Sequence, residues 1–203
     1  MAGALVLAGC HPTAAEPPLA GADLFRACDS CHGDKGQGDP VIAAPAIAGL
    51  PKWYVLMQLE DFRTGMRGAH PDDIEGLRMR PMSRQMKSQN ELDTVADYVS
   101  KLPAQKPVAT VKGNAEKGKT FYQTCMACHG ADGKGNEALK APRINAQHGW
   151  YLITQLRKFK AGVRSYNPSD TAGATMRPMA MTLPDETALA DVVAYIETLP
   201  AVN

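Results

Sequence analysis

The chain has 203 residues, 44% of them hydrophobic and 21% charged, with 22 basic and 21 acidic side chains. This composition excludes a disordered polyelectrolyte and a strongly basic nucleic-acid binder, so we expect no nucleic-acid partner. The longest apolar stretch, Met1 to Gly9, is far shorter than the ~20 residues that cross a bilayer, so no transmembrane helix is expected.

Residues 1–20 are predicted to be the remnant of a signal followed by a tether. The segment Leu7-Ala-Gly-Cys10 matches a bacterial lipoprotein box, in which small residues precede the cysteine that carries the lipid. The positively charged start of a signal peptide is missing and only nine residues precede Cys10, which would place the natural start upstream. Residues 11–19 then form the flexible tether of a lipid anchor at Cys10. The alternative is a leftover signal fragment.

The rest of the chain is an internal repeat with a constant offset of 97 residues and no gap. The segment Cys28-x-x-Cys31-His32 recurs as Cys125-x-x-Cys128-His129. The same offset pairs glycines, aromatic residues and prolines to the end of each half: Gly36 with Gly133, Trp53 with Trp150, Phe62 with Phe159, Tyr98 with Tyr195 and Pro103 with Pro200. We therefore predict two homologous domains, residues 21–103 and 113–203. Residues 104–112 would be a linker, or a strap laid over the surface.

Each half is predicted to begin with a short helix that delivers its Cys-x-x-Cys-His segment. These helices cover residues 22–31 and 119–128, and the glycines that follow should stop them. The next helix of each half shows apolar residues at helical spacing, namely Trp53, Leu56, Leu59 and Phe62, and Trp150, Ile153, Leu156 and Phe159. Gly65 and Gly162 are natural stops for this second pair.

The last helix of each half is predicted from its capping residue. In the first half it begins near Ser88, whose partner Glu91 completes a capping box, and Pro103 ends it. In the second half it begins near Asp185 and stops before Pro200. No run alternates apolar and polar residues as a half-buried strand would, so the fold class is all-α.

The Cys-x-x-Cys-His segments favour covalent haem attachment. Two thiols one helical turn apart can each add to a haem vinyl group, while the adjacent imidazole reaches the iron. A zinc ribbon would leave His32 and His129 without a reason to follow the second cysteine of each pair. A thioredoxin-like redox pair would need a strand–helix–strand setting that the sequence lacks.

The repeat also limits the residues that can occupy the sixth position of the iron. If both halves bind alike, the ligand must be the same residue type at the same offset, and the remaining histidines fail because His70 aligns with Asn167 and His148 with Pro51. Two methionine pairs pass this condition, Met79 with Met176 and Met82 with Met179. The Arg-Pro between the two methionines of each half predicts that no regular helix crosses this loop. One member of each pair would fill the core.

With these motifs, the chain resembles the class I c-type cytochromes, and specifically the dihaem cytochromes of the cytochrome c4 family, over residues 21–200. The resemblance implies two tandem class I cytochrome c domains, each a small helical bundle around a covalently bound haem c. It implies thioether bonds from Cys28, Cys31, Cys125 and Cys128, and iron ligation by His32 and His129. In such families the ligand methionine lies about seven residues before the leucine that opens the last helix. Leu183 thus indicates Met176, and the repeat indicates Met79, with Met82 and Met179 as the close alternatives.

The function that the resemblance implies is one-electron transfer rather than catalysis. The chain would carry electrons in a bacterial respiratory chain, from a quinol-oxidising complex or a dehydrogenase to a terminal oxidase or reductase, on the periplasmic side of the envelope. The alternatives are a cytochrome subunit of a redox enzyme complex and a peroxidase-like dihaem enzyme. A peroxidase would need one haem with an exchangeable ligand, whereas the two halves carry equivalent methionines.

Four arginines recur at the same offset near the predicted haem loops: Arg67 with Arg164, and Arg80 with Arg177. Guanidinium groups bind carboxylates in a bidentate manner, so these residues could pair with haem propionates. A solvated surface position is the equally weighted alternative.

Overall fold

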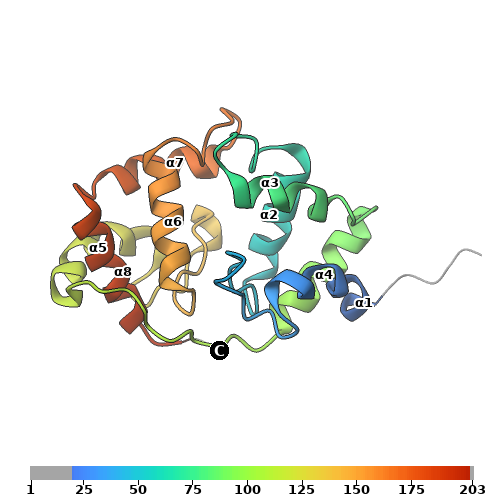
Figure 1. The fold of residues 1–203 in the computed structure, drawn as a ribbon, viewed down its shortest axis with the longest axis horizontal. Helices are drawn as coiled ribbons and strands as arrows, with labels where there is room; N and C mark the ends of the chain where they lie inside the picture. The colour runs from blue at the N-terminus through green and yellow to red at the C-terminus, as the bar shows by residue number, and fades with distance from the viewer. Residues whose placement is uncertain (1–19, 202–203) are drawn as a thin grey trace, which may run out of the picture.

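The computed structural model describes residues 20–201 and shows two halves with the same order of helices (Figure 1). The first half contains α1 (Gly21–His32), α2 (Lys52–Thr64), α3 (Ile74–Ser83) and α4 (Gln89–Lys101). The second contains α5 (Ala115–His129), the short 3₁₀ helix η1 (Glu137–Leu139), α6 (Gly149–Lys160), α7 (Thr171–Met181) and α8 (Glu186–Thr198). The described residues form no strand beyond two isolated bridges, which confirms the all-α prediction.

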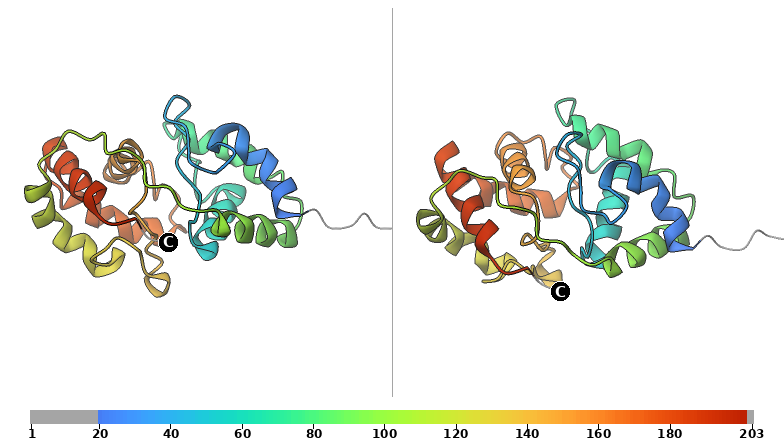
Figure 2. Two further views of the ribbon diagram at one scale, coloured as in Figure 1. Left: turned by 90° about the horizontal axis from the view of Figure 1, so that it is seen from below. Right: turned by 60° about the horizontal axis from the view of Figure 1, so that its bottom comes forward.

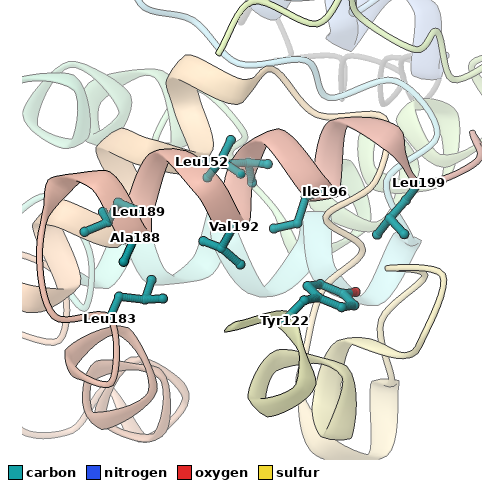
Figure 3. Packing of buried hydrophobic residues seen from close by; sticks show 9 residues of the cluster. Tyr122, Leu152, Leu183, Ala188, Leu189, Val192, Ile196 and Leu199 are labelled. Atoms are coloured by element: carbon teal, nitrogen blue, oxygen red, sulfur yellow. The ribbon is translucent and has the colours of Figure 1, made fainter. Parts of the chain in front are cut away.

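The last helix of each half is the centre of its core. In the first half α4 packs against α1 and α2, and in the second half α8 packs against α5 and α6. The buried face of α8 carries Leu189, Val192, Val193 and Ile196, which meet Tyr122 of α5 (Figure 3). The corresponding face of α4 carries Leu92, Val95 and Val99. Burial of each such side chain contributes about 1.5–3 kcal/mol, so these two faces supply much of the stability of each half.

Helices α5 and α8 approach so closely that only a glycine fits at their crossing. A Cβ atom built on Gly118 would lie 1.9 Å from the backbone carbonyl oxygen of Asp191. Gly21 occupies the same position in the first half, where a Cβ would lie 2.6 Å from the Cβ of Tyr98. The repeated glycine therefore marks a repeated helix crossing.

Gly118→Ala is expected to destabilise the chain by about 1–3 kcal/mol, because separating two packed helices costs more than the ~1 kcal/mol that alanine contributes to an isolated helix. Unfolding of the holoprotein by guanidinium, followed by circular dichroism, measures the change. Thr120→Ala, at an exposed site of the same helix, is the matched control and should be neutral or slightly stabilising. Equal stability of the two variants would contradict a close crossing.

Helix starts agree well with the predicted caps. The Ser88 side chain accepts a hydrogen bond from the backbone N–H of Glu91 at 3.2 Å, and Asp185 accepts from Ala188 at 2.8 Å. The carboxylate of Glu91 accepts from the N–H of Lys87 at 2.6 Å, one residue before the expected partner. Helix α5 begins four residues earlier than predicted, because the Asn114 side chain caps it by accepting from Lys117.

The methionine segments were expected to be loops, and this prediction is wrong. Met79 and Met82 lie in α3, and Met176 and Met179 lie in α7, with Pro81 and Pro178 inside these helices. Each proline sits in the last turn, so it removes only one helical hydrogen bond before the helix ends. The start of each helix is fixed by an aspartate cap, with Asp73 accepting from Gly76 and Asp170 from Gly173.

The segment between the halves, residues 104–112, is a strap along the second half (Figure 2). The Lys106 ammonium donates to the carbonyl of Leu199 at 2.8 Å. The N–H groups of Thr110 and Val111 both donate to the carboxylate of Glu197 at 3.1 and 3.2 Å. The strap is thereby attached to the C-terminal end of α8.

The two halves lie side by side (Figure 1), and they meet along a seam where α6 and the loop before it contact loops of the first half. Lys158 of α6 reaches across to Asp73 at 2.5 Å and also pairs with Glu75. The Lys158 and Asp73 side chains are only 12% and 4% exposed, so this is a buried ion pair. Within residues 20–201, no helix has the length and apolar composition needed to span a membrane.

Candidate functional site

Each Cys-x-x-Cys-His segment forms the last turn of the first helix of its half. Helix α1 ends at His32 and α5 at His129, and the next residue is a glycine with φ of 80° in both halves. This left-handed conformation favours glycine, and it turns the chain away directly after the histidine. The two cysteines of each segment are consequently one helical turn apart, as predicted.

The two histidines are buried and oriented identically. His32 is 6% exposed and His129 is 7% exposed. The Nδ1 atom of each lies 2.8 Å from a carbonyl oxygen, that of Pro45 for His32 and that of Pro142 for His129. Because a carbonyl can only accept, Nδ1 carries the proton and Nε2 is the nitrogen available to a metal. Burial lowers the pKa of both imidazoles, which favours the neutral form that binds metals.

One continuous cavity brings all the predicted site residues together. It is lined in both halves by the cysteines, the histidine and both candidate methionines: Cys28, Cys31, His32, Met79, Met82, Cys125, Cys128, His129, Met176 and Met179. Apolar side chains such as Leu59, Phe62, Leu156 and Phe159 complete the wall. Within the methionine pairs, Met179 is 37% exposed whereas Met176 is half-buried, and the sulfur of Met82 already accepts from Gln85 at 3.4 Å. These surroundings favour Met176 and Met79.

The structure buries Arg67 at the seam, leaves Arg164 half-buried beside it, and leaves Arg177 exposed. Arg67 donates to Gln58 of its own half and, at 3.3 Å, to Gln155 of the other half. Arg164 donates to Gln155 at 3.1 Å, and burial together with the charge of Arg67 lowers its pKa. The Nε atoms of both arginines are shielded from solvent and have no hydrogen-bond partner among residues 20–201.

These surroundings fit the haem that the sequence predicts. The guanidinium groups of Arg67, which is buried, and Arg164, which is half-buried, line the cavity, and no carboxylate of the described chain lies within ion-pair distance of either. Buried cations need anionic partners, and haem propionates would supply them. The neutral imidazoles, the thiols and the methionine sulfurs are the donor set that haem c requires.

Asp61 breaks the symmetry of the seam. It occupies in α2 the position that Lys158 occupies in α6, so a carboxyl group stands there in place of an ammonium. Burial raises the pKa of Asp61 to about 6, Asp170 adds to the increase, and Arg67 and Arg164 oppose it. The repeat gives no signal for this perturbed carboxyl, because its two halves differ at this position.

Asp61→Asn is expected to stabilise the chain above pH 6 and to leave it unchanged near pH 4. The carboxyl of Asp61 binds its proton more tightly in the folded state than in the unfolded chain, where the pKa is about 3.9. The stabilisation that protonated Asp61 contributes to the folded state is therefore fully present below pH ~4, and it is lost as the pH rises through about 6. Because Asp61 is partly exposed and solvent screens its interactions, the loss should be well below the roughly 3 kcal/mol that the full pKa shift corresponds to. Guanidinium unfolding at a series of pH values measures it, with the exposed Asp72→Asn as a charge-matched control. If the free energies of unfolding of wild type and Asp61→Asn differed by the same amount at every pH, a raised pKa for Asp61 would be ruled out.

Comparison with known proteins agrees with this geometry. Residues 18–103 and residues 115–200 each match the cytochrome c family. Cytochrome c4 of Azotobacter vinelandii is 28% identical over 197 residues, which cover 92% of this chain and 90% of that protein. The thiosulfate dehydrogenase electron acceptor of Stutzerimonas stutzeri is 31% identical over 165 residues, covering 76% and 72% of the two chains. The crystal structure of reduced cytochrome c4 from Pseudomonas stutzeri is similar with a TM-score of 0.69 and 28% identity, over 89% of this chain and 97% of that one.

Proposed function

The chain belongs to the cytochrome c family, with one domain of the family in each half, and from this we propose that it relays single electrons between proteins of a bacterial respiratory chain. It is a dihaem electron carrier similar to cytochrome c4, and it holds two covalently bound haem c groups. The observation that carries the proposal is the single cavity that both Cys-x-x-Cys-His segments line, because two haem groups held in one cavity would be close enough for transfer within the chain.

We assign the site residues by the geometry of each half. Cys28 and Cys31 form the thioethers of the N-terminal haem, and Cys125 and Cys128 those of the C-terminal haem. His32 and Met79 bind the first iron, and His129 and Met176 the second. When bound, the haem would supply the one-electron chemistry, and the histidine and methionine of each half would hold its iron in either oxidation state. The Nδ1 hydrogen bonds to Pro45 and Pro142 hold each imidazole in orientation, and the apolar wall excludes water.

The partners follow from the chemistry of the carrier. A methionine ligand and an apolar pocket both raise the haem potential, so the donor is a quinol-oxidising complex or a dehydrogenase and the acceptor is a terminal oxidase or reductase. One relative is a thiosulfate dehydrogenase electron acceptor, which supports a dehydrogenase donor. We place the protein on the periplasmic side of the envelope, with a lipid anchor at Cys10, a residue outside the described part of the chain.

Absorption spectroscopy of the purified holoprotein tests this function. The reduced and oxidised spectra should show two haems per chain, and the weak far-red sulfur-to-iron band should account for both. Carbon monoxide should leave the reduced spectrum unchanged, because two methionine-ligated irons have no open position. A haem that lacks the band and binds carbon monoxide would contradict the carrier and favour a peroxidase-like enzyme.

A second candidate is a cytochrome subunit of a redox enzyme complex. The similarity to an electron acceptor of thiosulfate dehydrogenase favours it. Purification of the tagged chain from its native membranes distinguishes the two functions. A stable stoichiometric complex with a dehydrogenase or an oxidase supports the subunit, and recovery of the chain alone supports the diffusing carrier.

A further inference from the structure

One peptide group of the first half lies between two hydrogen bonds that lead in opposite directions. The carbonyl of Pro45 accepts from His32 Nδ1 at 2.8 Å. The N–H of the same peptide group, which belongs to Ala46, donates to the Oε1 atom of Gln147 at 3.2 Å. The Nε2 atom of Gln147 in turn donates to the carbonyl of Ala46 at 2.8 Å. A side chain of the second half is thus connected to the predicted iron ligand of the first half through one peptide.

The loop that carries Gln147 is held firmly against the first half. Arg143 donates to the carbonyl of Ala48 at 3.0 Å, and His148 Nε2 lies 2.8 Å from the carbonyl of Gln37. The backbone of Ala146, directly before Gln147, has φ of 55°, a left-handed conformation that strains an alanine. The first half has Gly49 at the corresponding position, with φ of 64° at no such cost. At this position of the repeat, the strained non-glycine residue therefore stands directly before the side chain that makes the cross-domain contact.

The reverse contact is missing from the repeat. The position of the first half that corresponds to Gln147 is Leu50, whose side chain has no hydrogen-bonding atom. The Pro142–Arg143 peptide, which accepts from His129, therefore receives no equivalent amide from the first half. The cross-domain hydrogen bond therefore reaches the peptide behind the iron ligand of the N-terminal haem only.

The consequence for the iron follows from hydrogen-bond polarisation. A peptide whose N–H is donated becomes a better acceptor at its carbonyl, and the effect is stronger in a buried site such as this, where Ala46 is 7% exposed and His32 is 6% exposed. A stronger acceptor at Nδ1 increases the electron donation of the imidazole to a bound metal. A more basic imidazole stabilises Fe(III) relative to Fe(II).

We propose that Gln147 is a positioning residue for the N-terminal haem, which lowers the potential of that haem alone by polarising the Pro45–Ala46 peptide. The inference rests on the proposed ligation of iron by His32. In the step concerned, Fe(III) takes one electron from the donor protein and becomes Fe(II), with no bond broken and no proton required. Gln147 makes the two haems of the repeat unequal, and it does so only while the halves are docked.

Redox titration of the holoprotein, followed by NMR of the haem methyl signals, tests the inference for each haem separately. Gln147→Leu, which introduces the residue of the first half, should increase the reduction equilibrium constant of the N-terminal haem by up to about tenfold, or 59 mV for one electron. The C-terminal haem should not change. Gln147→Glu keeps an acceptor for the Ala46 N–H, and it should keep the potential at or below the wild-type value. The Nδ1 proton signal of His32 in the reduced protein should move upfield in Gln147→Leu and not in Gln147→Glu.

His148→Phe is the matched control, because it removes a neighbouring cross-domain hydrogen bond and leaves the Pro45–Ala46 peptide untouched. It should leave both potentials in place at pH 8. The inference is overturned if Gln147→Leu changes neither potential, if it shifts both haems equally, or if His148→Phe shifts the N-terminal haem as much. A far-red band that still accounts for two haems in these variants shows that the carrier function stands whichever way the potentials fall.

Discussion

Met176→His is expected to lower the potential of the C-terminal haem strongly and to remove half of the far-red sulfur-to-iron band. Axial ligands set haem potentials over a range of ~0.8 V, and replacing a thioether by a second imidazole favours Fe(III). Met176 lines the cavity and is half-buried, as the ligand must be. Spectroelectrochemistry of the variant measures the potential and the band in one experiment.

Met179→His is the matched control, since Met179 lies in the same helix and is 37% exposed. It should keep the full band and both potentials. The assignment of Met176 would be reversed if the Met179 variant lost half the band and the Met176 variant kept it. Met79→His and Met82→His make the same comparison in the first half, with the loss expected for Met79.

Lys158→Met is expected to be the most destabilising single change at the seam, by about 3–5 kcal/mol. Removing the ammonium leaves Asp73 buried and charged without its partner, and such unpaired charges cost this much. Burial tends to raise the pKa of Asp73, yet the hydrogen bond from Lys158 holds it below its usual value. The stability that Lys158 contributes should therefore be present at neutral pH and be lost as the pH falls through the lowered pKa. Guanidinium unfolding at pH 7 measures the loss.

Lys101→Met provides the comparison for this variant. Lys101 and Asp97 form an ion pair of 2.6 Å whose side chains are 72% and 44% exposed, so breaking it should cost far less than breaking the buried pair. The double variant Lys158→Met with Asp73→Asn should recover part of the lost stability, because no unpaired charge stays buried at position 73. A loss for Lys158→Met no greater than that for Lys101→Met would show that the seam contact is solvated.

The features that the sequence predicts well are local or repeated. Caps such as Ser88 and Asp185 act on their own helices, and the Cys-x-x-Cys-His segments carry their chemistry within five residues. The prediction of loops for the methionine segments rested on the prolines alone, and it did not include the aspartate caps that start α3 and α7. A proline in the last turn of a helix removes only one helical hydrogen bond. The Asp73-x-x-Gly76 pattern is the sequence signal for the start of this helix.

The features that the sequence does not predict lie at the seam. Lys158 with Asp73 and Gln147 with Ala46 join residues that are 85 and 101 positions apart, and no local pattern reports such contacts. The repeat also directs attention to residues that recur, whereas Lys158 aligns with Asp61 and Gln147 with Leu50. Arg67 and Arg164 do recur, but recurrence indicated only a place near the haem loops; their position at the seam follows from the packing of the two halves.

The asymmetry at positions 61 and 158 has a consequence for how two halves of this kind can pair. Around the seam, two copies of the first half would set Asp61 of each against Asp73 of the other, and like charges would drive them apart. Two copies of the second half would instead set Lys158 of each against Asp170 of the other and attract. Because residues 104–112 join the halves covalently, the chain can hold the attractive contact of Lys158 with Asp73 without its symmetric counterpart, and position 61 is left open to a different residue.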